Sequence, residues 1–280
     1  MNTTPTDLAT VQARRVRFVP AAQPHDHVLR EFAQPQRTLA ICETLTAEAC
    51  TQVAAGPAVD HELLFLFLPA GAATPPEWQQ RAAQWLAGPV AQANHAPLEV
   101  MLRSDRVVWR PGRALFQGAP ERMDEALAAL AEFAFLEGQL RRLERDLDAD
   151  TVVAQGDVAL THSVTSPDLA RREHVNDMTR RTTARRLYLP LLERSLESPS
   201  ADLSGSARRL LAELGNQADV ADRLESLEDR NEVIYDLYEL ANDRLSEFGY
   251  YRSEWWLELW IIVILLAELV GIGLELWMNW

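Results

Sequence analysis

Residues 255–280 read WWLELWIIVILLAELVGIGLELWMNW, and this stretch decides the architecture of the chain. A helix from Trp256 to Trp277 would rise about 31 Å, close to the ~30 Å hydrocarbon thickness of a bilayer. Tryptophans gather at both ends of the stretch, as in an interfacial aromatic belt: Trp255, Trp256 and Trp260 at one, Trp277 and Trp280 at the other. We therefore predict a transmembrane helix over 255–278. A buried helix of a soluble protein is the alternative.

Acidic residues interrupt this apolar run on one side of the helix. At 100° per residue, Glu254, Glu258, Glu268 and Glu275 share a stripe about 100° wide. About thirteen Leu, Ile and Val side chains favour insertion by roughly 5 kcal/mol, whereas Glu268 at mid-membrane opposes it by about 3 kcal/mol. Because such a stripe avoids lipid, we expect a homo-oligomer or a partner helix in the membrane. A single helix with protonated glutamates is the alternative.

Basic residues flank this predicted span only on its N-terminal side. Arg244 and Arg252 precede it, and no basic residue follows it. The positive-inside rule then predicts a cytoplasmic N-terminal part and a tail-anchored, single-pass topology. Residues 1–20 contain no apolar segment of a signal peptide. We expect the membrane to be a bacterial inner membrane.

A heptad pattern precedes the span and predicts a coiled-coil-like stalk over 216–250. Apolar residues recur with a 4-3-4-3 spacing, and the polar Asn231 occupies an a-type position that can fix register. Gly249 ends the pattern and is a candidate hinge. The stalk could pair between chains or pack within one chain. The seam consists of Val220, Leu224, Leu227, Asn231, Ile234, Tyr238, Ala241, Leu245 and Phe248.

The N-terminal part predicts a mixed α/β domain over 11–118, after a disordered segment at 1–10. The apolar run LLFLFL is typical of a buried strand, and Ser104-Asp105 between two apolar segments indicates a hairpin. The predicted strands are 16–19, 38–42, 63–68, 100–102 and 107–109, and the predicted helices are 47–55 and 77–86.

The pattern becomes helical over 119–215. We expect a helix over 123–147, a non-helical stretch over 151–158, and a helix over 168–196 that is kinked or broken at Pro190. Arginines in the last helix could contact anionic lipid or RNA, or form an ordinary solvated face. The predicted class is thus α+β: a mixed α/β domain, long helices, a stalk and one transmembrane helix.

Composition excludes several functions. The net charge is −14 and mean hydropathy is −0.17, which argues against a polytopic membrane protein and against direct nucleic-acid binding. All 27 basic residues are arginine, so Schiff-base and Walker-type lysine chemistry is excluded. The two cysteines, Cys42 and Cys50, are expected to be reduced thiols, and a disulfide between them is the alternative.

Motifs of known chemistry do not occur in the chain. His25 and His27 lack the spacing of a zinc site, and the grouping of His162, Ser163 and Asp168 is of a kind that arises by chance. We predict no catalytic residue, no metal and no cofactor. Two alternatives stay open: a membrane-tethered enzyme with a site near His25, His27 and His61, and an oligomeric conduit lined by Glu258, Glu268 and Glu275.

The C-terminal part resembles one known family. Residues 231–276, which begin NEVIYDLYELANDRLSEFGYYRSEWW, are similar to the tail of the "required for meiotic nuclear division" family, whose bacterial members are called YagE. The matching positions are Asn242–Leu245, Arg252, Glu254-Trp255 and Glu268, and the likeness is firmest over 220–275. It implies a single-span membrane protein without known enzymatic activity. Eukaryotic members lie in the mitochondrial inner membrane and support translation there.

Together these patterns predict a tail-anchored, cytoplasm-facing oligomeric scaffold. Its expected partners are the lipid bilayer and further copies of the chain or another membrane helix.

Overall fold

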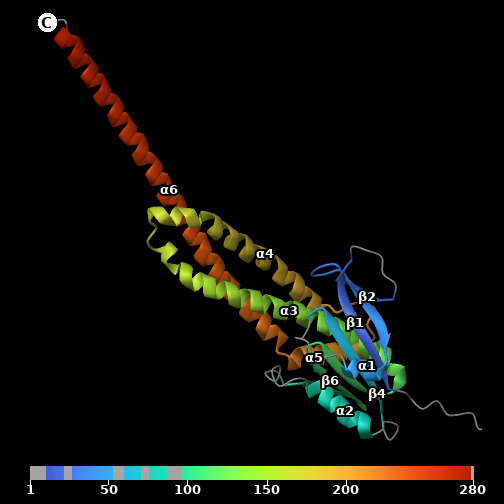
Figure 1. Ribbon diagram of the computed structural model, residues 1–280. Helices are drawn as coiled ribbons and strands as arrows, with labels where there is room; N and C mark the ends of the chain where they lie inside the picture. Colours follow the sequence, from blue (N-terminus) through green and yellow to red (C-terminus); the bar gives the residue numbers. More distant parts are fainter. Residues whose placement is uncertain (1–10, 22–26, 53–59, 71–75, 88–95, 279–280) are drawn as a thin grey trace, which may run out of the picture. The chain divides into compact units, whose positions relative to one another are not determined.

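A computed structural model shows the fold of the chain (Figure 1). It has two compact units, each assembled from two stretches of sequence. The first unit, Met1–Asp146 with Leu187–Glu228, contains a β-sheet and helices, and the second, Leu147–Arg186 with Asp229–Trp280, is helical. A mixed sheet followed by long helices confirms the predicted α+β class. The described residues are 11–21, 27–52, 60–70, 76–87 and 96–278, so residues 1–10 lie outside them.

The first unit is built on a seven-stranded sheet with the order β2-β3-β1-β4-β7-β6-β5. Neighbouring strands are antiparallel except β4 and β7, which pair in parallel. The strands are β1 (Gln12–Pro20), β2 (Val28–Phe32), β3 (Thr38–Leu45), β4 (Glu62–Pro69), β5 (Leu98–Leu102), β6 (Asp105–Arg110) and β7 (Arg113–Gly118).

Strand β4 lies at the centre of the sheet because both of its faces are apolar. Its sequence is ELLFLFLP, and every residue after Glu62 is buried. A strand covered on both faces has such a continuous apolar run. The buried strand predicted over 63–68 is therefore confirmed, as is the hairpin of β5 and β6, in which Leu102 pairs with Asp105.

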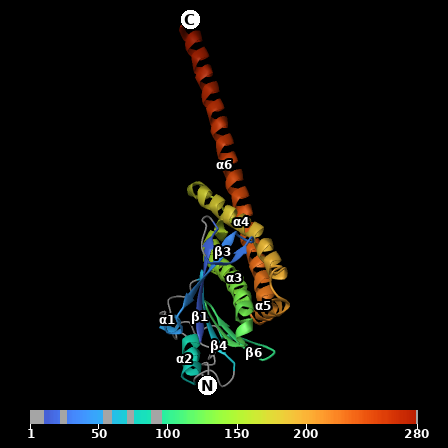
Figure 2. The ribbon, with the colours of Figure 1, turned by 90° about the vertical axis from the view of Figure 1, so that its right-hand side faces the viewer.

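Five longer helices and one short helix occur in the described part of the chain. Helices α1 and α2 pack on one face, where Cys50 and Trp85 belong to the same core cluster as Leu66 of β4. Helix α3 packs on the other face (Figure 2). The ring of its Phe133 lies edge-on to Trp109 of β6, with ring centroids 4.8 Å apart. The helices are α1 (Ala47–Gln52), α2 (Pro76–Ala87), α3 (Met123–Asp157), α4 (Arg172–Glu197), α5 (Gly205–Gln217) and α6 (Val220–Met278).

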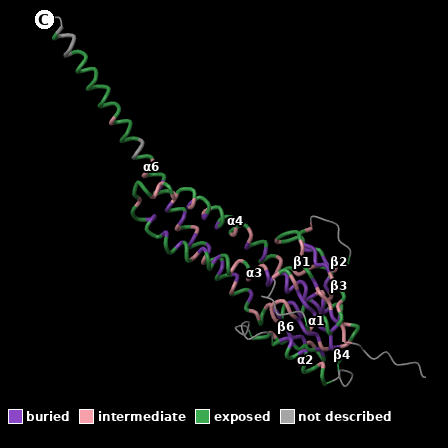
Figure 3. Tube along the Cα trace, in the orientation of Figure 1, coloured by how far each residue is buried: buried purple, intermediate pink, exposed green. Residues whose placement is uncertain are grey.

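The second unit is a bundle of three helical segments. It contains the C-terminal end of α3, the first part of α4, and α6 from Asp229 onward. Two short 3-10 turns, η4 (Val158–Thr161) and η5 (Ser166–Arg171), join α3 to α4. Buried residues line the inside of the bundle, and α6 then continues as a helix on which almost all of the residues with described burial from 254 to 272 are exposed (Figure 3).

One local prediction about the long helices is wrong, and of the expected kink or break at Pro190 only the break is excluded. The stretch 151–158 was expected to be non-helical, but α3 continues to Asp157. Its Ala154 and Asp157 are buried, so packing outweighs the low helix propensity of the β-branched and glycine residues there. Helix α4 also runs through Pro190 to Glu197 without a break.

Gly249 does not interrupt α6, which is one helix from Val220 to Met278. A Cβ at this glycine would lie 3.9 Å from the Leu169 side chain, an ordinary contact. The helix therefore passes from the bundle into the apolar segment without a hinge in this conformation.

Candidate membrane anchor and buried polar network

The C-terminal half of α6 is exposed although it is apolar. Helix α6 is long and apolar enough to cross a membrane, and no part of its most apolar 18-residue window is buried. Leu257, Ile264 and Val270 have 65%, 55% and 60% of their surface exposed. A helix that is apolar on all sides is normally covered by protein or by lipid. This segment is thus a candidate membrane span.

The predicted interfacial tryptophans are exposed on this helix. Trp255, Trp256, Trp260 and Trp277 have 58%, 48%, 60% and 79% of their surface exposed. The rings of Trp255 and Trp256 contact each other edge-on, with centroids 5.6 Å apart. Trp280 lies outside the described residues.

The predicted acidic stripe is exposed as far as its side chains are described. Glu254, Glu258 and Glu268 are all exposed, and none of them forms an ion pair within the described part of the chain. The side chain of Glu275 lies outside the described residues. The described part of the chain therefore does not cover these carboxylates.

The predicted stalk seam is buried within a single chain. Asn231, Ile234, Tyr238 and Leu245 lie inside the helical unit, and Val220, Leu224 and Leu227 are buried in the first unit, each with 6% or less of its surface exposed. Ala241 is also buried, and Phe248 is half-buried. The heptad spacing thus marks the face of α6 that packs against helices of its own chain.

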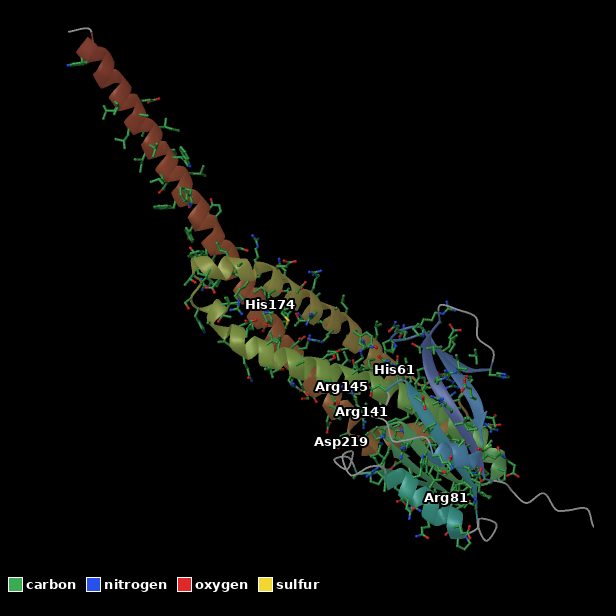
Figure 4. The ribbon with its side chains drawn as sticks, in the orientation of Figure 1. His61, Arg81, Arg141, Arg145, His174 and Asp219 are labelled. Carbon is green, nitrogen blue, oxygen red and sulfur yellow. The ribbon has the colours of Figure 1, made fainter. Side chains whose placement is uncertain are left out.

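Asp157, at the C-terminal end of α3, is the centre of a buried polar network in the second unit. The Tyr238 hydroxyl on α6 donates to Asp157 Oδ2 at 2.7 Å. His174 Nε2 on α4 lies 2.7 Å from the same oxygen, and the Arg171 guanidinium pairs with Oδ1. His174 is labelled in Figure 4. One carboxylate therefore connects all three helical segments of the bundle.

The electrostatics of this network follow from its burial. Asp157 has 2% of its surface exposed and Tyr238 has none. Burial raises the pKa of Tyr238, and the hydrogen bond and negative charge of Asp157 raise it further, so the phenol keeps its proton. Because both oxygens of Asp157 are occupied by donors, the arrangement fits a structural hub better than a catalytic carboxylate.

A second polar layer lies about two turns away along α3 and α6. Asp150 of α3 pairs with Arg181 and Arg185 of α4. Asn231 of α6 donates from Nδ2 to the Thr182 carbonyl at 3.1 Å. Among the described residues, Asn231 Oδ1 and Arg185 Nη1 are buried without a partner. Asn231 thus specifies the pairing of α6 with α4 inside the chain, the kind of register role that its heptad position suggested.

Sequence reasoning missed this network. The partners of Asp157 lie 14 to 81 residues away along the chain, so no local motif shows them. The stretch around Asp157 was also expected to be non-helical, so its place on a helix of the bundle could not be predicted. Asp168, by contrast, accepts hydrogen bonds from the Thr165 backbone and hydroxyl in a capping box, which lowers its pKa.

Two of the three histidines considered for metal binding are described. His27 and His61 are exposed, and their backbone carbonyls accept hydrogen bonds from the backbone of Cys42 and Phe18. His25 lies outside the described residues. No group of three or more His, Cys, Asp or Glu side chains that could hold a metal occurs among the described residues.

Comparisons with known proteins add little. No family model matches the sequence, and no curated protein matches it. Among solved structures, the full-length CmaX protein is similar at 13% identity, over 78% of this chain and 77% of that chain, with a TM-score of 0.37. A likeness at that TM-score carries no argument about fold or function.

Proposed function

We propose that the protein is a single-pass membrane protein whose α6 anchors it, and that it serves as an oligomeric scaffold rather than as a catalyst. The exposed apolar end of α6 carries this proposal, because a soluble protein would bury such a helix. The bulk of the chain then lies in the cytoplasm, since Arg244 and Arg252 precede the span. The resemblance to the YagE-like family and a bacterial inner-membrane location belong to the same proposal.

We propose that copies of the chain associate through their membrane spans. The heptad seam is already buried within one chain and leaves little apolar surface for an intermolecular coil. Glu254, Glu258 and Glu268 are exposed without ion pairs in the described chain, and a carboxylate near mid-membrane is stabilised by a neighbouring helix. The acidic stripe therefore supports packing of spans against each other.

Membrane insertion is tested by extraction at alkaline pH and by proteolysis of inverted membrane vesicles. The wild-type chain should stay in the membrane, with its N-terminal part cleaved from the cytoplasmic side. Ile264→Arg should move it to the soluble or aggregated fraction, because about 3 kcal/mol at mid-membrane cancels the remaining balance of roughly 2 kcal/mol. Leu240→Arg, at an exposed leucine outside the span, is the matched control. Wild-type recovery in the soluble fraction would refute the anchor.

Assembly through the stripe is tested by measuring the mass of the detergent-solubilised chain. Glu268→Leu should leave insertion intact and change the oligomer. Leu266→Ile, on the opposite side of the helix at 100° per residue, should change neither. An oligomer that is the same in wild type and Glu268→Leu contradicts packing through the stripe.

A further inference from the structure

A cavity of about 870 Å³ opens in the first unit. It lies between the C-terminal end of α4, helix α5 and the first two turns of α6, with Phe133 of α3 at its base. Asp219, labelled in Figure 4, marks the corner between α5 and α6 and has a positive φ of 50°. We call this feature the α5–α6 groove.

The floor of the groove is apolar. Leu211 of α5 and Leu224 of α6 line it together with Leu196 of α4. On the α5 side the lining includes two small residues, Ala212 and Gly215, whose side chains take up little of the groove. From Arg208 to Gly215 this wall extends about 10 Å, at 1.5 Å per residue, which matches roughly two turns of a helix laid alongside.

The rim of the groove is rich in carboxylates. Its exposed carboxylates include Glu193, Glu197, Asp219, Asp222 and Glu225, and none of these five forms an ion pair within the described part of the chain. Arginine pairs with carboxylates elsewhere in the same unit, as Arg223 does with Glu137 and Glu144.

The one basic residue of the lining does not neutralise this rim. Arg208 donates to the Ala201 backbone carbonyl at 2.8 Å and forms no ion pair among the described residues. Like charges gathered around an apolar floor are mutually repulsive. A cation placed between them relieves the repulsion, while an apolar side chain fills the floor.

We propose that the α5–α6 groove binds a basic amphipathic helix of a partner protein. An apolar floor selects the apolar face of the helix, and the carboxylates select arginine or lysine along its flanks, in the manner of helix-in-groove recognition. Nucleic acid is excluded by the sign of the rim. The proposal is independent of the membrane anchor, because every residue that carries it lies in the first unit.

The test uses the full chain in nanodiscs of zwitterionic lipid and a fluorescent helical peptide of about fourteen residues, with leucine at i, i+3, i+4 and i+7 and arginine elsewhere. Binding is measured by anisotropy after subtraction of empty nanodiscs. We expect saturable binding that weakens as salt rises. The same peptide with glutamate in place of arginine should not bind.

Helix α6 provides a matched pair of variants. Asp222→Arg with Glu225→Arg reverses two charges on the groove and should weaken peptide binding about tenfold or more. Asp229→Arg with Glu232→Arg makes the same two changes seven residues further along α6, where neither residue lines the groove. This control should alter binding less than about twofold. Circular dichroism confirms that both variants are folded.

Four outcomes would overturn the proposal. The first is no saturable binding to folded wild type, and the second is an equal loss in the two double variants. The third is displacement of the peptide by a linear polyamine at matched charge concentration, which would show that the groove recognises charge alone. The fourth is that wild type does not bind the peptide while its oligomer dissociates only in the double variant Asp222→Arg with Glu225→Arg. That result would assign the groove to a second copy of the chain.

Discussion

Replacing Tyr238 by phenylalanine isolates the contribution of the Asp157 network to the helical unit. The substitution removes a hydroxyl that donates to Asp157 Oδ2 at 2.7 Å, from a side chain with no exposed surface. Phenylalanine has the same ring, so no large cavity forms. A hydrogen bond to a buried charged group contributes about 1.5–3 kcal/mol. Because Arg171 and His174 still satisfy the carboxylate, we expect the lower end, about 1.5 kcal/mol.

The assay is native-state hydrogen exchange by mass spectrometry on the full chain in nanodiscs. A loss of about 1.5 kcal/mol raises the opening constant of the bundle about tenfold. Peptides from 147–157 and 172–186 should therefore exchange about ten times faster in Tyr238→Phe. Peptides from the β-sheet should not change if the two units open separately.

Tyr235→Phe is the matched control. Tyr235 lies one turn before Tyr238 on α6, is only half-buried, and its ring contacts Arg186. No hydrogen bond of its hydroxyl is found among the described residues, so its loss should change exchange less than about twofold. Equal exchange in the two variants would refute the role assigned to the Asp157 network.

Three further predictions concern titration and packing. Burial and Asp157 raise the pKa of Tyr238 above its ordinary 10.0. The stabilisation of the folded state by its neutral hydroxyl is therefore complete below pH 10 and is lost as the pH rises above 10. Tyr238→Phe should lack this pH-dependent loss of stability in alkaline unfolding. Burial raises the pKa of Cys50 to about 11, so at pH 8 maleimide should label it about 100-fold more slowly in the folded than in the urea-unfolded chain. Gly118→Ala should destabilise the first unit by about 2 kcal/mol in a urea titration, because its Cβ would overlap the Asp105 carboxylate. Gly156→Ala, whose Cβ meets nothing within 4 Å, should stabilise α3 by up to about 1 kcal/mol in the same measurement.

Apolar segments within β1, β3, β4, β5 and β6 could be predicted from sequence, whereas β2 and β7 could not. The run at 63–68 identifies β4 directly, whereas β2 contains Arg30 and Glu31 and was missed. Arg30 is buried because Glu132 of α3 and Asp202 pair with it. Those partners lie 102 and 172 residues away, so local sequence gives no reason to expect a buried arginine in a strand. Strand β7 has the sequence RALFQG, in which only three consecutive residues are apolar, and it was also missed.

The same limit applies to the candidate sites. The apolar segment of α6 is a local property of composition, and the structure leaves it exposed as a candidate span. The Asp157 network and the α5–α6 groove join residues from three or four helices, and only the folded chain brings them together. Heptad spacing correctly identified which face of α6 is buried, but spacing alone could not tell whether the partner helices belong to the same chain.

The continuity of α6 has a mechanical consequence. A single helix carries the Tyr238 hydroxyl inside the bundle and Glu268 in the apolar segment, and no proline lies between them. Rotation or axial displacement of the apolar segment is therefore transmitted along the helix, unless the helix bends at a point such as Gly249. A bilayer that thickens, thins or changes its lipid composition would act on the tilt of this segment. For a span in a bilayer, as proposed, the hydrogen bond from Tyr238 to Asp157 would resist such a displacement, because it joins α6 to the end of α3.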